Sequence, residues 1–190
     1  MMLITGIGNP GMKYHHTRHN AGYFGIDAIR QELQFEGFYS DDAFKHDRNL
    51  MSETTPIKWA KKDVIILQKS QTAMNKSGKA VKKAFEKYEV NIDEFILFHD
   101  DLDIKLGQFK IQKGKSPKGH NGVKSIEDTL GTTDFWRVRI GIDNREEGEK
   151  IVGEDYVLQR FTKEEIKTIQ GVCMAASEEL LFTELFELWI

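Results

Sequence analysis

The chain has 190 residues, of which 39% are hydrophobic and 11% aromatic, and its formal net charge is −3 at pH 7. This length allows one substantial hydrophobic core without requiring two, so the sequence predicts a single domain over residues 1–190. No apolar run approaches the ~18 residues of a membrane span, and the N-terminus lacks the pattern of a signal peptide. The composition therefore argues against a membrane protein and predicts a cytoplasmic one.

The single cysteine, Cys173, lies in a helical apolar pattern and cannot form an internal disulfide. We expect an inert core thiol at this position, not a nucleophile.

In the first half of the chain, the apolar run 2–7 predicts a buried strand that a Gly/Pro cluster ends. Apolar residues at helical spacing predict a helix over 21–33. The runs 57–59 and 64–67, separated by polar residues, predict a hairpin, whereas 40–49 is polar and has no clear pattern. The spacing from Met74 to Tyr88 predicts an amphipathic helix with Asn75 in its first turn.

The second half continues the alternation of strands and helices. A continuous apolar run, 95–98, predicts a buried strand that stops at His99-Asp100-Asp101-Leu102-Asp103. Further elements are expected in this order: a strand over 106–112, a helix over 123–130, a strand over 136–142, and a helix over 162–182 capped by Thr162 and Glu165. This order predicts an α/β fold: a three-layer α/β/α domain with a mixed, mostly parallel twisted sheet.

The loop after the first strand carries Gly6-Ile7-Gly8-Asn9-Pro10-Gly11 and then Thr17-Arg18-His19-Asn20. Ligands bind at the carboxyl ends of strands in open α/β sheets, so this loop is a candidate site. The glycine spacing also matches a dinucleotide-binding fingerprint, but the polar run that follows separates it from the helix the fingerprint needs. His15 and His19 are four residues apart, as in helical zinc sites, yet no helical pattern surrounds them.

Polar side chains recur after the other predicted strands, giving a set that suits hydrolysis of an ester or amide by an activated water. His19 would take a proton from the water, and Asp100 would fix its tautomer. Carboxamides of Asn9, Asn75 and Asn121 would place the carbonyl and donate to the oxyanion. The residues alone leave an alternative open, in which Asp100, Asp101 and Asp103 hold Mg²⁺.

The charge is distributed unevenly along the chain. Residues 104–126 contain six lysines and no acid, whereas residues 143–190 contain twelve acids and five bases. Such asymmetry indicates a basic face, which suits either a polyanionic partner or simple solvation.

Several motifs, in order, resemble those of bacterial peptidyl-tRNA hydrolase. They are Gly6-Ile7-Gly8-Asn9-Pro10-Gly11, Tyr14, Thr17-Arg18-His19-Asn20-Ala21-Gly22, Met74-Asn75-x-Ser77-Gly78-x-Ala80-Val81, His99-Asp100-Asp101-Leu102-Asp103, Gly119-His120-Asn121-Gly122 and Arg137-Val138-Arg139-Ile140-Gly141-Ile142. The resemblance runs from Leu3 to about Phe161, and the C-terminal helix is only loosely similar.

The resemblance implies a monomeric α/β/α hydrolase that cleaves the ester between a peptide and the 3′ ribose of tRNA, without a metal or other cofactor. His19 is implied as the catalytic base and Asp100 as its partner, with peptidyl-tRNA as the partner molecule. The residues implied to bind substrate are Asn9, Tyr14, Met74, Asn75, His120 and Asn121. A basic site for a tRNA phosphate is implied near Lys113 and Arg139.

Three segments depart from the family pattern: Ala73, the loop Lys115-Ser116-Pro117-Lys118, and Asp143-Asn144-Arg145. None of them touches the five polar positions that carry the chemistry. Two other functions stay open: an RNA-binding relative of the same fold without catalysis, and a nicotinamide-dependent dehydrogenase. Retention of His19 and Asp100 together argues against the first.

Overall fold

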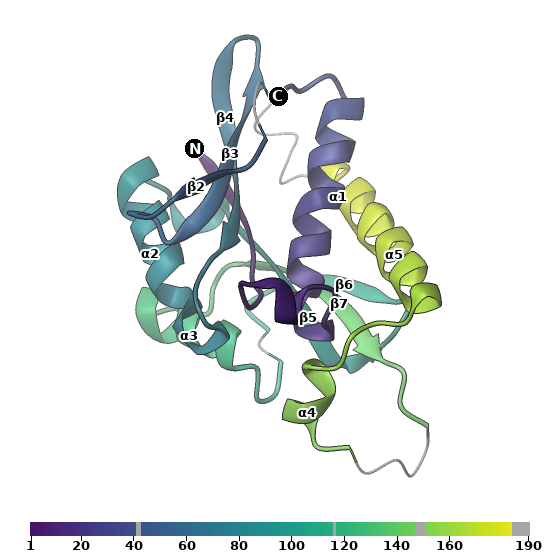
Figure 1. The fold of residues 1–190 in the computed structure, drawn as a ribbon. Coiled ribbons are helices and arrows are strands. Elements are labelled where there is room, and N and C mark those ends of the chain that lie inside the picture. The colour runs from purple at the N-terminus through teal and green to yellow at the C-terminus, as the bar shows by residue number, and fades with distance from the viewer. Residues whose placement is uncertain (41–42, 116, 147–150, 184–190) are drawn as a thin grey trace.

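The computed structural model describes residues 1–40, 43–115, 117–146 and 151–183, and its centre is a seven-stranded sheet in the order β2-β3-β4-β1-β5-β7-β6 (Figure 1). The strands are β1 (Met2–Gly6), β2 (Lys45–Asp47), β3 (Ser52–Trp59), β4 (Lys62–Ser70), β5 (Phe95–Lys105), β6 (Phe109–Lys113) and β7 (Trp136–Asp143). The four central strands, β4, β1, β5 and β7, are parallel, and β2, β3 and β6 pair antiparallel at the two edges. The prediction of a mixed sheet is confirmed, and its parallel pairings are the three between the four central strands.

Helices cover both faces of this sheet, as Figure 1 shows. On one face lie α1 (Ala21–Phe35) and α5 (Lys163–Leu181), and on the other α2 (Ser77–Tyr88) and α3 (Asn121–Leu130). The short elements are α4 (Gly153–Val157) and the 3₁₀ turns η1 (Met12–Tyr14), η2 (Arg18–Asn20), η3 (Met74–Lys76) and η4 (Ile92–Glu94). The three-layer α/β/α arrangement predicted from the sequence is therefore confirmed.

The buried side chains divide into two clusters because successive residues of a strand point to opposite faces. In β1, Ile4 belongs to the cluster under α1 and α5, whereas Leu3 belongs to the cluster under α2 and α3. All five residues of β1 are buried, as expected of a central strand covered on both faces.

The strand predicted over 95–98 does not stop at His99 but continues to Lys105. Pairing with β7 continues along this extension of β5, with Asp100 opposite Ile140 and Asp101 opposite Gly141. On its other side, β1 ends at Gly6 opposite Phe98. The charged residues therefore lie within a strand, on the part that extends past the end of its neighbour.

Other boundaries differ by a few residues. The helix predicted from Met74 begins as the 3₁₀ turn η3, and regular α-helix starts at Ser77. The strand predicted from Leu106 starts at Phe109, because Gly107 has a φ of 92° in a turn that Gln108 N–H closes onto the carbonyl of Lys105. The helix predicted from Val123 starts two residues earlier, at Asn121.

Two glycines bring the N-terminus of α1 against the sheet, and with it the turn that holds His19. A Cβ on Gly22 would collide with the backbone of Ile7 and the carbonyl of Phe98, and a Cβ on Gly6 with the carbonyl of Gly22. Only glycine permits this approach of helix to strand.

Cys173 is buried in the cluster under α1 and α5, as predicted, and burial raises the pKa of its thiol, which keeps it protonated and unreactive. Among the described residues, no helix has the length and apolarity needed to cross a membrane.

Candidate active site

Three ionisable side chains meet at the carboxyl end of the central strands. His19 comes from η2, directly before α1, Asp100 from the extended part of β5, and His120 is the N-cap of α3. His19 Nδ1 lies 2.9 Å from both carboxylate oxygens of Asp100, and His120 Nε2 lies 2.9 Å from Oδ1. The pairing of His19 with Asp100 that the sequence suggested is present in the structure.

The hydrogen bonds of His120 fix where the protons are. Its Nδ1 accepts from the backbone N–H groups of Gly122 and Val123, at 3.1 and 3.3 Å. The proton of the neutral ring therefore sits on Nε2 and is donated to Asp100. An ionised carboxylate only accepts, so His19 donates its Nδ1 proton to Asp100, and Nε2 of His19 carries a free lone pair.

The electrostatics maintain this arrangement. Burial alone would raise the pKa of Asp100, but its electrostatic attraction to the His19 and His120 imidazoles and the hydrogen bonds that they donate hold this pKa well below the ordinary value. Burial lowers the pKa of His19, yet the Asp100 charge and hydrogen bond outweigh it and leave the pKa raised above 6.5. Asp100 is thus a fixed anion, and His19 is a base of increased proton affinity.

Carboxamides surround the base. Asn9 Oδ1 accepts a hydrogen bond from the backbone N–H of Met74 at 2.9 Å, which leaves its Nδ2 group to donate to a ligand. A hollow of about 250 Å³ opens beside these groups. Its lining residues are Asn9, His19, Met74, Asn75, Asn121, Glu154, Val157 and Leu158. One base and three carboxamides therefore share a single cavity.

Two residues that lie in the quoted motifs, Asn20 and His99, had no role assigned from the sequence. The Asn20 side chain forms two hydrogen bonds with the Asn9 backbone: it accepts one from the N–H at 2.8 Å and donates one to the carbonyl at 3.0 Å. Its position directly after His19 is the sequence signal that could have indicated this role of Asn20. His99 donates to the carbonyl of Asp100 at 2.7 Å, and burial lowers its pKa to about 3.

The short helix α4 closes one side of the site. Glu154 and Val157 line the first hollow and also an adjoining one of about 330 Å³, to which Leu102, Pro117 and Lys118 contribute. No spacing in the sequence connects α4 with residues more than thirty positions earlier, so only the fold reveals this wall. Of the loop that departs from the family pattern, Ser116 lies outside the described residues.

Of two residues predicted to bind substrate, one lines the hollow beside His19 and the other does not. Met74 is 5% exposed and lines the hollow beside His19. Tyr14 is half-buried in η1, where its carbonyl accepts from the Thr17 hydroxyl at 2.8 Å. Its side chain is not among those that line either hollow.

The structure does not bring Lys113 to this site. Lys113 pairs with Trp136 at the start of β7, whereas Asp100 pairs with Ile140 further along the same strand. Its ammonium lies 2.8 Å from Asp93 and 3.5 Å from Asp134.

Arg139 is held in an ion pair of its own. Its guanidinium donates to Asp101 and to Gln112, both at 2.7 Å, and its side chain is only 11% exposed. A phosphate-binding role for Lys113 and Arg139 stays a prediction. It requires each side chain to release its acidic partner and bind a phosphate instead.

The Mg²⁺ alternative is not supported by the geometry. Asp100 binds the two histidines, whereas Asp101 points to the opposite face of β5 and binds Arg139. His19, Asp100 and His120 are the one group of possible metal ligands found among the described residues. In that group His120 Nε2 carries a proton and its Nδ1 is occupied, so His120 has no lone pair to offer a cation.

The dinucleotide alternative is also not supported. After Gly11 the chain forms η1 and η2, and α1 begins only at Ala21. A Cβ on Gly8 would meet the side chains of Asn20 and Tyr23, so this glycine serves close packing and not the approach of a pyrophosphate.

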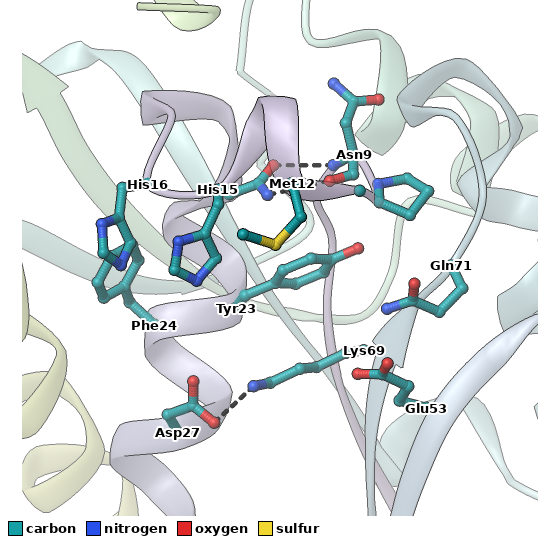
Figure 2. A pocket seen from close by; sticks show the side chains of 13 residues that line it. Asn9, Met12, His15, His16, Tyr23, Phe24, Asp27, Glu53, Lys69 and Gln71 are labelled. Carbon is teal, nitrogen blue, oxygen red and sulfur yellow. Dashed lines mark hydrogen bonds and ion pairs between the residues drawn. The ribbon is translucent and has the colours of Figure 1, made fainter. Parts of the chain in front are cut away.

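A further hollow of about 380 Å³ adjoins Asn9 and Asn20 without His19 in its lining (Figure 2). Across it, Lys69 of β4 reaches Asp27 of α1 at 2.5 Å, and the Tyr23 hydroxyl donates to the carbonyl of Ser70. These groups satisfy one another, and the base is absent, so we assign the chemistry to the smaller hollow beside His19.

Similarity to known proteins identifies the family of this chain. The family model "Peptidyl-tRNA hydrolase" matches residues 3–186. The peptidyl-tRNA hydrolase of Bacillus thuringiensis subsp. konkukian is 37% identical over 176 residues, covering 89% of this chain and 85% of the relative. That of Halalkalibacterium halodurans is 34% identical and covers 97% and 94%.

Solved structures are similar over almost the whole chain. A peptidyl-tRNA hydrolase in complex with N-propanol superposes with a TM-score of 0.80 at 29% identity, and the enzyme of Acinetobacter baumannii with 0.80 at 28%. Each comparison covers 98% of this chain and 89% of the other. The chain belongs to the peptidyl-tRNA hydrolase family.

Proposed function

We propose that this protein hydrolyses the ester bond between a peptide and the 3′ ribose of tRNA, and so returns to use the tRNA lost from stalled ribosomes. The observation that carries the proposal is the base at His19. Its Nδ1 proton is held by a buried carboxylate, its Nε2 lone pair has no partner among the described residues, and three carboxamides share its hollow.

In the proposed reaction, His19 Nε2 takes a proton from a water molecule as the water oxygen attacks the ester carbonyl. The carbonyl oxygen becomes an oxyanion that accepts hydrogen bonds from carboxamide N–H groups. When the tetrahedral intermediate collapses, the ester C–O bond breaks and the imidazolium returns its proton to the 3′ oxygen of the ribose. The products are tRNA and the carboxylic acid of the peptide, which loses its proton to solvent, and Asp100 remains ionised throughout.

The proposed roles of the other residues follow from their contacts. Asn9, Asn75 and Asn121 bind the peptide, the water or the oxyanion, and Met74 forms an apolar wall. His120, predicted from the resemblance to bind substrate, holds Asp100 in place instead of acting on the ester. Tyr14 retains a substrate role only as a prediction.

An RNA-binding relative without catalysis is the less favoured alternative. Such a protein has no need for a buried carboxylate that orients a histidine, and this chain keeps both at hydrogen-bond distance. We further propose that residues 1–190 act as one domain, as a monomer in the cytoplasm, where translation supplies the substrate.

The test is turnover of peptidyl-tRNA by the purified protein, with an unblocked aminoacyl-tRNA as the comparison substrate. We expect rapid release of peptide from the first and far slower hydrolysis of the second. Binding of tRNA without release of peptide would instead identify the non-catalytic relative.

A further inference from the structure

The structure contains a row of lysines that the sequence motifs did not single out. Lys76, Lys79 and Lys83 are exposed and follow one another at i, i+3 and i+7 from the end of η3 along α2. This spacing places them on one side of the helix, over roughly 10 Å at 1.5 Å per residue. No acidic side chain in the described part of the chain forms an ion pair with any of the three.

Other lysines of α2 differ in this respect. Lys82 lies 4.0 Å from Glu86, one turn further on, and Lys87 lies 3.0 Å from Asp47. Like charges at i, i+4, such as Lys79 and Lys83, destabilise a helix. Repulsion within this row of unneutralised lysines therefore destabilises the helix. Binding of an anionic partner would neutralise the row.

The row begins at the catalytic hollow. Lys76 directly follows Asn75, which lines that hollow with His19 and Asn9. α2 then carries the row away from the hollow along the outside of the sheet, beside α3 (Figure 1). The row therefore starts one residue after the lining of the hollow and leads away from it.

We infer that Lys76, Lys79 and Lys83 bind the phosphodiester backbone of the nucleic acid whose 3′ ribose ester lies at His19. The inference rests on the proposed function and extends it, because it states on which side of the cleft the RNA leaves. Strand phosphates spaced by about 3.4 Å along a stacked helix allow several contacts over a row of this length. The phosphate-binding candidates that the family resemblance implied, Lys113 and Arg139, are both already engaged by acidic side chains.

The experiment compares two double variants of the same helix that lose the same charge: Lys79→Ala with Lys83→Ala, and Lys82→Ala with Lys87→Ala as the matched control. Alanine is a good helix former, and thermal unfolding of both variants verifies the fold. Equilibrium binding of deacylated tRNA is measured across a salt series. This measurement needs no hydrolysis, so it can fail independently of the proposed activity.

Each phosphate contact to a single strand contributes about 0.7 to the log-log salt slope of binding, so losing two contacts should reduce the slope by about 1.4. The control should keep the wild-type slope. In turnover, the ratio of kcat/KM on peptidyl-tRNA to kcat/KM on a peptide ester of a single nucleoside should fall about tenfold in the first variant only.

Equal slopes and equal ratios in the two double variants would overturn the inference. Failure of the wild type to hydrolyse peptidyl-tRNA, with the slope difference intact, would overturn the proposed function and leave the lysine row as an RNA-binding surface.

Discussion

The neutral tautomer of His120 determines the state of the whole site. Because two backbone N–H groups occupy its Nδ1, its one proton faces Asp100. Asp100 then has two imidazole donors and no proton of its own, which is why its pKa lies far below the ordinary value despite burial. No group among the described residues forms a hydrogen bond with the basic Nε2 of His19.

Replacing Asp100 by asparagine should both slow the reaction and move its pH profile. The base must be unprotonated to act, so wild-type activity should fall as the pH decreases through a value above about 6.5, the ordinary histidine pKa. Without the carboxylate charge the pKa of His19 decreases, so the fall should occur at lower pH, while kcat at neutral pH drops by about 10² to 10⁴. The measurement is the pH-rate profile of the wild type and the variant. If the activity of both proteins falls at the same acidic pH, the prediction is contradicted.

His120→Asn separates the two roles of that side chain. Asparagine is a favoured N-cap and can still accept from the start of α3, but it is too short to reach Asp100. Loss of one hydrogen bond to a charged group should reduce kcat by about tenfold and leave KM nearly unchanged. An increase in KM with kcat retained would instead indicate that His120 contacts the substrate, as the family resemblance implies.

At the scale of elements, an ion pair joins the turn that carries His19 to α5. Arg18 donates to Glu165 at 2.7 Å, both side chains are 8% exposed, and the guanidinium packs over the ring of Tyr156 at 4.4 Å. Glu165 also accepts from the N–H of Thr162 in the capping box that the sequence predicted. One carboxylate therefore starts α5 and anchors η2.

Glu165→Gln should retain the hydrogen bond that caps α5 but remove the carboxylate charge. Arg18 then remains buried without its counterion. We expect a loss of about 3 kcal/mol in the free energy of unfolding and a decrease in Tm of roughly 6 to 12 °C. The pKa of Glu165 is lowered, since its hydrogen bonds and Arg18 outweigh burial, so the stabilisation exists above the ordinary carboxyl pKa and is lost as the pH falls through the lower folded value. The exposed neighbour Glu164 provides the control, and equal Tm values for the two variants would contradict the account.

The type and order of the long helices and the central strands could be predicted because each of these elements has a local signal. Periodic apolar residues marked the helices, and continuous apolar runs marked the buried strands. The end of β5 could not be predicted, because the pairing of Asp100 and Asp101 with β7 depends on residues forty positions away. For the same reason β2, a short polar strand at the edge of the sheet, had no recognisable pattern.

For the whole molecule, the contact between His19 and Asp100 could be predicted and the charged surface could not. His19 and Asp100 follow strands that the pattern identified, and parallel strands bring their carboxyl ends together. The environment of a lysine depends instead on which acids the fold places near it. Lys113 is paired with Asp93 and Asp134, both distant in sequence, whereas Lys79 and Lys83 form no such pair within the described residues.

A chelator should leave the activity of the whole protein unchanged. Water activation is assigned to an imidazole, and the protons of His19 and His120 are both committed to Asp100. The measurement is the initial rate on peptidyl-tRNA before and after dialysis against EDTA. Loss of activity that a divalent cation restores would contradict this arrangement of protons.

The most direct test of the central claim is the single-turnover rate of peptidyl-tRNA hydrolysis by wild type and His19→Ala, with tRNA affinity measured on the same samples. If His19 is the base, the rate should fall by about 10² to 10⁴ while the Kd for tRNA stays within about twofold. A variant that retains near-normal single-turnover rates would show that another group activates the water and would contradict the mechanism.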